Sequence, residues 1–127
     1  MVNEHKVAGY ENFKSFMKDF KSNGAAINIL FTGEKDKNGV SWCPDCVSAE
    51  PHIKNALEKF ADKNSHFICV DVGDRATWKD MNNPFRKDKD THLMVIPTLI
   101  RYKHPQRLEG EQLEKEDLLE MFFNDDD

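Results

Sequence analysis

The sequence predicts an α/β domain in which helices cover both faces of a mixed β-sheet. Apolar segments of strand length, residues 25–33 and 66–73, alternate with segments of helical periodicity, and helices between strands call for parallel pairing. The link at residues 104–106 is short enough only for an antiparallel hairpin. A chain of 127 residues, 39% hydrophobic and 32% charged, suits a single domain over residues 1–127.

The first half of the chain predicts a helix, a strand, a loop and a second helix. Apolar residues recur at helical spacing before the turn residues Asn23 and Gly24: Tyr10, Phe13, Phe16, Met17 and Phe20. The uncharged strand that begins at residue 25 or 26 has the composition of one buried on both faces. The polar loop of residues 34–41 then leads to a helix from Cys43 to Phe60, in which Pro51 is expected to introduce a kink.

The second half predicts a strand at residues 66–73 and then a long polar stretch, residues 75–95, of short helical turns and loop. A third strand at residues 99–103 follows Pro97, a fourth is expected at residues 107–110, and a closing helix at residues 113–123. The predicted order is therefore αβαβ followed by ββα. The acidic end, residues 124–127, is expected to be flexible.

Composition and charge exclude several function classes. The formal net charge of −5 disfavours a nucleic-acid partner, because a phosphate backbone would be repelled on average. No apolar run approaches the roughly 20 residues that cross a bilayer, and the first ten residues lack the features of a secretory signal. We therefore expect a cytosolic protein that does not bind membranes, and in the cytosol a cysteine pair is more often catalytic or metal-binding than structural.

The stretch SWCPDC, residues 41–46, places two thiols at the start of the second predicted helix. The unpaired amides and the dipole of a helix N-terminus favour a negative charge on Cys43. Cys46 lies one turn deeper, within reach of Cys43 and shielded from other disulfides. We therefore expect Cys43 to attack a disulfide and Cys46 to resolve the mixed disulfide as a positioned intramolecular reactant.

A zinc site is the alternative for this cysteine pair, and the sequence disfavours it. Zinc needs two further ligands, usually a second close pair, whereas the chain offers only Cys69 and scattered histidines: His5, His52, His66, His92 and His104. His66 and Cys69 are three residues apart in a predicted strand, so their side chains point to opposite faces. No metal site is predicted, and Cys69 is interpreted as a small buried apolar residue.

The motif WCPDC at the start of a proline-containing helix, followed about fifty residues later by Ile96-Pro97-Thr98, resembles the thioredoxin fold. More closely, the chain resembles the thioredoxin domain-containing protein 17 family. The shared residues run through most of the chain: 31–33, 41–46, 49–51, 78–80, 82–83, 85–87, 97–99 and 105–106. The resemblance implies a mixed sheet of four to five strands, a cis peptide bond before Pro97 and a reversible disulfide between Cys43 and Cys46.

The same resemblance implies a function. It implies a monomeric, cytosolic disulfide reductase of cell redox homeostasis, with no tightly bound cofactor and with electrons from NADPH through thioredoxin reductase. The expected acceptors are small disulfides such as cystine, selected protein disulfides, nitrosothiols and persulfides. The residues expected to contact substrate are Trp42, Pro44, Ile96 and Pro97. The alternative is a binding module that uses the cysteine pair as a redox-controlled contact surface in signalling and shows little turnover.

The sequence departs from thioredoxins at three places near the motif. The segments 34–41 and 78–90 are longer, and they are expected to border the site and restrict broad protein surfaces. The segment of residues 88–95 is also about two residues longer than the corresponding segment of the family that the chain resembles. The strand before the motif lacks the buried acid that thioredoxins usually carry, so Asp45 and Glu50 become the candidate proton acceptors for Cys46. Both carboxylates also have a structural interpretation, as charges favoured near a helix N-terminus or exposed to solvent.

Overall fold

Five strands form one mixed sheet in the computed structural model, which describes residues 2–124. The strand order is β1-β3-β2-β4-β5. The three strands β1 (Asn3–Ala8), β3 (His66–Asp71) and β2 (Ile27–Thr32) are parallel. The strands β4 (Thr98–Arg101) and β5 (Arg107–Glu109) are antiparallel, β4 to β2 and β5 to β4. The predicted mixed sheet is confirmed.

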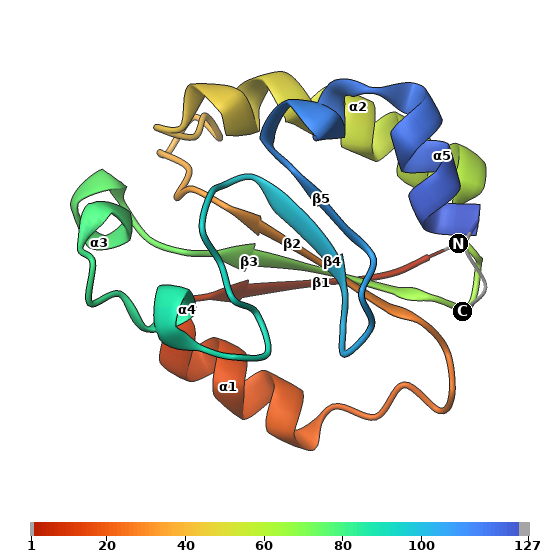
Figure 1. Cartoon of the computed structure of the whole chain (residues 1–127), viewed down its shortest axis with the longest axis horizontal. Helices are drawn as coiled ribbons and strands as arrows, with labels where there is room; N and C mark the ends of the chain where they lie inside the picture. Colours follow the sequence, from red (N-terminus) through yellow and green to blue (C-terminus); the bar gives the residue numbers. More distant parts are fainter. Residues whose placement is uncertain (1, 125–127) are drawn as a thin grey trace.

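Helices cover both faces of this sheet (Figure 1). Helix α1 (Tyr10–Asp19) lies on one face, and α2 (Pro44–Phe60), the 3-10 helix η1 (Gly110–Glu114) and α5 (Glu116–Asn124) pack together on the other. Strand β2 contributes to both layers, because its side chains alternate: Ile29 and Phe31 join the core on the α1 side, and Leu30 joins the core under α2. The apolar run predicted for this strand is continuous because both of its faces are buried in a core.

Strand register brings the start of α2 and the residues before β4 together. Strand β2 ends at Thr32, close to where α2 begins, and Phe31 pairs with Thr98 of β4 in antiparallel register. This pairing places Pro97 beside the carboxyl end of β2, although it is 54 positions after Cys43 in the sequence. The sheet therefore carries the start of α2 and the residues before β4 to the same edge.

The first strand was missed by the sequence analysis. The segment Asn3–Ala8 has a polar sequence, NEHKVA, and lies at the edge of the sheet with much of its surface exposed, so hydrophobic alternation gives almost no signal. Its register with β3 is complete over six residue pairs. A contact of 3.2 Å between His5 Nε2 and His66 Nδ1 joins the two strands below the rings of Phe16 and Phe20.

The predicted closing helix is also corrected. Instead of one helix over residues 113–123, the structure has the 3-10 helix η1 and then α5, which starts at Glu116. Asn124, which was assigned to the flexible end, is the last residue of α5, and the three final aspartates lie outside the described residues. Helix α2 runs through Pro51 without ending.

The connection between β3 and β4 contains the short helices α3 (Arg75–Lys79) and α4 (Pro84–Lys87), as the polar stretch predicted. Phe85 of α4 is 2% exposed, and its ring lies 5.2 to 5.9 Å from those of Tyr10, Phe13 and Phe31. Asp88, just after α4, accepts hydrogen bonds from the Tyr10 hydroxyl at 2.7 Å and Lys14 Nζ at 3.0 Å. The connection is therefore part of the core on the α1 side.

A candidate dithiol site at the start of helix α2

Cys43 is the N-cap residue of α2, and Cys46 lies in the first turn of the same helix. The backbone amide of Cys46 donates to Cys43 Sγ at 3.2 Å, which satisfies one of the helix's unpaired amides and favours negative charge on that sulfur. Pro44 occupies the first turn, where its missing N–H costs no hydrogen bond, and it is exposed. Both cysteines are free thiols and each is 5% exposed.

Cys46 has the opposite electrostatic character. Burial raises the pKa of the Cys46 thiol to about 12, and the hydrogen bond with Cys43 acts in the same direction. The Thr32 side chain and the Gly33 backbone act against this rise in pKa, because their polar groups favour the Cys46 thiolate. At neutral pH Cys46 therefore keeps its proton, and the roles of the two thiols stay a prediction.

Ile96 and Pro97 lie next to Cys43. The peptide bond between them is cis, as the resemblance implied, and both residues are buried. The Ile96 carbonyl oxygen lies 4.0 Å from Cys43 Sγ. The side chain of Thr98 donates to the Val95 carbonyl at 2.7 Å, so the backbone on both sides of the cis bond is fixed.

The residues before the motif hold Cys43 in place through their own hydrogen bonds. The Ser41 hydroxyl accepts from the Cys43 amide at 3.1 Å and donates to the Gly33 carbonyl at 3.0 Å. The Trp42 indole donates to the Gly73 carbonyl at 2.9 Å. A Cβ at position 33 would lie 2.9 Å from the Trp42 ring, so glycine is needed where the ring crosses the chain.

The structure places the two candidate carboxylates differently. Asp45 is exposed in the first turn of α2. Glu50 forms ion pairs with Lys35 at 2.6 Å and with Lys54 at 3.5 Å, and the hydrogen bond from Lys35 is the largest cause that lowers the pKa of Glu50. The groups that shift the Cys46 pKa besides burial are Cys43, Thr32 and Gly33, and neither carboxylate is among them. Proton transfer to either carboxylate stays a prediction.

Thr32 and Gly33 are functional candidates that the sequence analysis did not assign to the site. The signal was available, since FTG ends the strand before the motif, but side-chain direction at a strand end depends on register. Beside them lies a cavity of about 280 Å³, lined in part by Lys6, Lys35 and Asp71. Half-buried Cys69 also lines it, and burial raises the pKa of its thiol.

Residues 2–124 contain no group of three or more His, Cys, Asp or Glu side chains that would hold a metal ion. His66 packs against rings on the α1 side while Cys69 joins the core under α2, as their spacing predicted. Within the same part of the chain, no helix combines the length and apolar character needed to cross a membrane.

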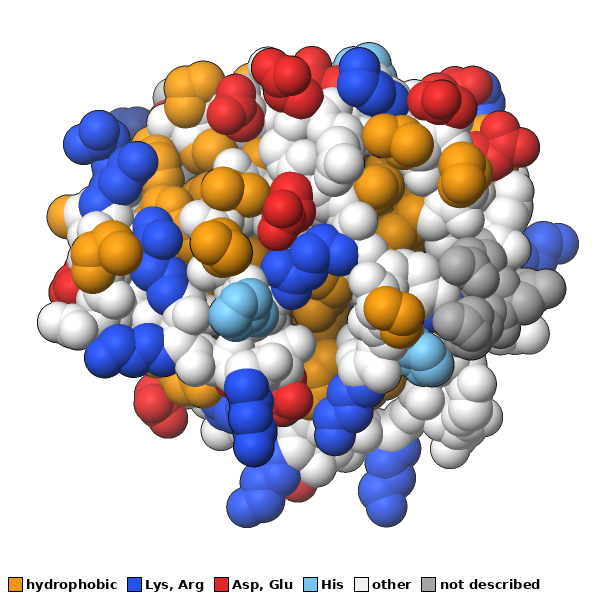
Figure 2. Space-filling view, in the orientation of Figure 1, with side chains coloured by type: hydrophobic (Ala, Val, Ile, Leu, Met, Phe, Trp, Pro, Cys, Tyr) orange, Lys and Arg blue, Asp and Glu red, His pale blue; other side chains and the backbone are white. Residues whose placement is uncertain are grey.

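The surface near the dithiol is partly apolar. Large exposed apolar side chains lie in the loop before the motif, on α2, between α3 and α4, and before Ile96: Val40, Val47, Met81, Met94 and Val95. In Figure 2, apolar side chains gather on the left of the visible face, where Figure 1 shows the start of α2 and α3. Four of these side chains, Val40, Val47, Met94 and Val95, lie within three residues in sequence of Cys43, Cys46 or Ile96.

A mixed sheet with this order, a helix capped by the first of two cysteines, and a cis proline beside that cysteine define a thioredoxin-like protein. The fold agrees with solved structures: it superposes on reduced Schistosoma mansoni thioredoxin pre-protein with a TM-score of 0.58 and 18% identity, over 96% of this chain and 99% of the other. Fasciola hepatica thioredoxin gives a TM-score of 0.53 at 19% identity, with 91% of each chain covered.

Within that class the chain belongs to the thioredoxin domain-containing protein 17-like family, whose thioredoxin-domain model matches residues 6–125. It is 45% identical over 123 residues to Thioredoxin domain-containing protein 17 of Danio rerio, covering 97% of this chain and 96% of the relative. The same-named protein of Homo sapiens is 41% identical with the same coverage. The predicted family is confirmed, and membership together with the Cys43–Cys46 pair indicates a thiol redox role.

Proposed function

We propose that this protein is a cytosolic, monomeric disulfide reductase that works through the Cys43 and Cys46 dithiol. The observation that carries the proposal is the asymmetry of the pair: Cys43 caps α2 and accepts an amide hydrogen bond, while buried Cys46 lies in hydrogen-bond contact with it. Small disulfides such as cystine, selected protein disulfides, nitrosothiols and persulfides are the proposed acceptors. Thioredoxin reductase and NADPH supply the electrons, so no tightly bound cofactor is required.

Reduction of a disulfide proceeds in two exchange steps. The Cys43 thiolate attacks one substrate sulfur, a bond forms between them, and the other substrate sulfur leaves as a thiolate. Cys46 then loses its proton to solvent or a nearby base and attacks Cys43 Sγ, which releases the second substrate thiolate and leaves the Cys43–Cys46 disulfide. Two electrons pass from the dithiol to the substrate. The substrate lies against Trp42, Pro44, Ile96 and Pro97 in this proposal.

Turnover with purified thioredoxin reductase, NADPH and cystine tests the proposal. We expect NADPH absorbance to fall at a rate that depends on this protein and that is lost in Cys43→Ser. The competing function is a redox-controlled binding module, favoured by the exposed Val40, Met94 and Val95. Such a module would bind partners differently in its oxidised and reduced forms without consuming NADPH, and this outcome would replace the reductase proposal.

Thr32→Val is expected to slow release of the mixed disulfide about tenfold at neutral pH. The substitution keeps the shape of the side chain and removes a hydroxyl that stabilises the Cys46 thiolate, and a hydrogen bond to a charged group contributes about 1.5 kcal/mol or more. Because the Cys46 pKa lies at about 12, the release rate should rise with pH across the neutral range as the thiolate fraction grows. Stopped-flow tryptophan fluorescence as a function of pH measures it.

Thr32→Ser, which keeps the hydroxyl, is the matched control and should stay close to the parent rate. Glu50→Gln is the comparison for the carboxylate hypothesis. If Glu50 accepts the Cys46 proton, its substitution slows release more than formation of the mixed disulfide. Equal rates in both steps for Glu50→Gln and its parent would remove Glu50 from the mechanism, and an unchanged release rate in Thr32→Val would remove Thr32.

A further inference from the structure

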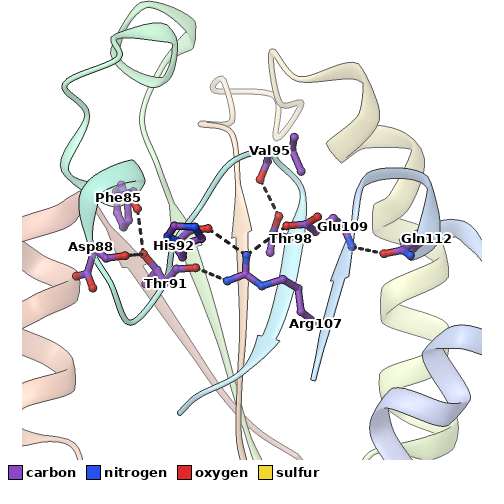
Figure 3. A network of polar contacts seen from close by, with 9 residues as sticks. All are labelled: Phe85, Asp88, Thr91, His92, Val95, Thr98, Arg107, Glu109 and Gln112. Atoms are coloured by element: carbon purple, nitrogen blue, oxygen red, sulfur yellow. Dashed lines mark hydrogen bonds and ion pairs between the residues drawn. The ribbon is translucent and has the colours of Figure 1, made fainter. Parts of the chain in front are cut away.

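Arg107 of β5 forms hydrogen bonds with the segment that leads to the cis proline, as Figure 3 shows. Its guanidinium donates to two successive main-chain carbonyls, those of Thr91 and His92, the second at 3.1 Å. The same group forms an ion pair with Glu109 at 3.2 Å. The two carbonyl contacts tie a strand at the sheet edge to a loop that is 15 residues away in sequence, and the ion pair with Glu109 lies within β5.

One of the two main-chain carbonyls that Arg107 contacts belongs to a residue with an unfavourable backbone conformation. His92 has a φ of 44°, in the left-handed region that residues with a side chain rarely adopt. Such a residue persists only where its surroundings hold it. The planar guanidinium can donate to two neighbouring acceptors at once, which the single ammonium of a lysine does not reproduce in the same geometry.

The residues that follow His92 connect the contacts of Arg107 to Cys43. Leu93 is fully buried, and its amide donates to the Phe85 carbonyl at 3.4 Å. Met94 and Val95 then turn outward, 64% and 43% exposed, immediately before Ile96 reaches Cys43. Arg107 and Leu93 thus anchor the beginning of a short apolar wall whose other end is the cis proline.

We propose that Arg107 is a positioning residue that sets substrate selectivity: it fixes the wall formed by Met94, Val95 and Ile96 beside Cys43. This inference rests on the proposed reductase function and deepens it. A wall held in one position leaves room beside the sulfur for a small disulfide and obstructs the surface of a folded protein. Release of the wall admits larger disulfides and weakens contacts with small ones.

Arg107→Lys tests the proposal, because lysine keeps the charge and loses the paired geometry. We expect the ratio of kcat/KM for cystine to kcat/KM for insulin to fall about fivefold, through a higher KM for cystine and faster insulin reduction. Alkylation of Cys43 by iodoacetamide should proceed at the parent rate. Amide hydrogen exchange at residues 92–95 should accelerate about tenfold, a readout that does not depend on turnover.

Arg86→Lys is the matched control. Arg86 also donates to a main-chain carbonyl, that of Trp78 at 3.0 Å, but it lies in α4 and holds α3. Folding of each variant is checked by circular dichroism. An unchanged substrate ratio in folded Arg107→Lys, an equal loss on both substrates, or an equal shift in Arg86→Lys would overturn the selectivity role. An inactive parent protein would overturn the proposed function instead, while hydrogen exchange would still report whether Arg107 fixes the loop.

Discussion

Cys46→Ser is expected to stop catalytic turnover and to accumulate a covalent adduct between Cys43 and half of the substrate disulfide. Serine at position 46 keeps the size and the amide hydrogen bond to Cys43 Sγ, so the first exchange step proceeds. The second step lacks its intramolecular thiol, whose effective concentration in a well-oriented pair greatly exceeds that of any external thiol. Turnover should therefore fall by about a thousandfold or more. Mass spectrometry after exposure to cystine measures the adduct on Cys43.

Cys69→Ser is the matched control for this experiment, since it removes the third thiol from the cavity beside Thr32. Its turnover should stay within about twofold of the parent, as expected of a surface or structural substitution outside the reacting atoms. Normal turnover by Cys46→Ser without an adduct would show that Cys46 does not resolve the mixed disulfide. An adduct on Cys69 would show that the wrong sulfur was identified as the nucleophile.

Phe85→Ala should lower the free energy of unfolding by about 3 to 5 kcal/mol, the usual cost of deleting a buried aromatic ring. Phe85 belongs to the connection between β3 and β4, yet its ring meets Tyr10, Phe13 and Phe31 in the core on the α1 side. Its backbone carbonyl also accepts from the Thr91 hydroxyl at 3.0 Å. Chemical denaturation followed by circular dichroism measures the change.

Met81→Ala provides the contrast in the same connection, because Met81 is 74% exposed. Its effect should stay within about 0.5 kcal/mol. A loss below about 1 kcal/mol in Phe85→Ala would mean that α4 rests on the surface and does not belong to the core. In that case the loop before the cis proline would lose its support on the α1 side.

Much of this fold was predictable from hydrophobic pattern because the central strands are buried on both faces. The run from Ile27 to Thr32 was located for that reason. The helix that starts after Cys43 was located from the helical spacing of its apolar residues. Strand β1 was not predicted, because its residues are polar and lie at an exposed edge of the sheet. It is a strand because its backbone pairs with that of β3. The division between η1 and α5 lies at Lys115, whose backbone is extended (φ −107°, ψ 112°), and periodicity does not reveal it.

The two cysteines were predictable as the centre of the site because their spacing and position at a helix start are local features. The partners of Cys46 were not, because contact with Thr32 depends on which way the end of a strand faces. The role assigned to Arg107 had no local signal at all. Its acceptors Thr91 and His92 are 16 and 15 residues away in sequence, and only the tertiary structure, with β5 paired to β4, brings them to the guanidinium.

The two cysteines and the wall beside them come from different parts of the chain. The sulfurs are carried by the β2–α2 junction, and the wall by the loop before β4 that Arg107 of β5 restrains. Under the proposed function, a change in the length of residues 88–95 alters which disulfides reach Cys43 and leaves both sulfurs in place. Loop grafts at this position offer the same separation to protein engineers, since the helix cap at Cys43 belongs to another part of the chain.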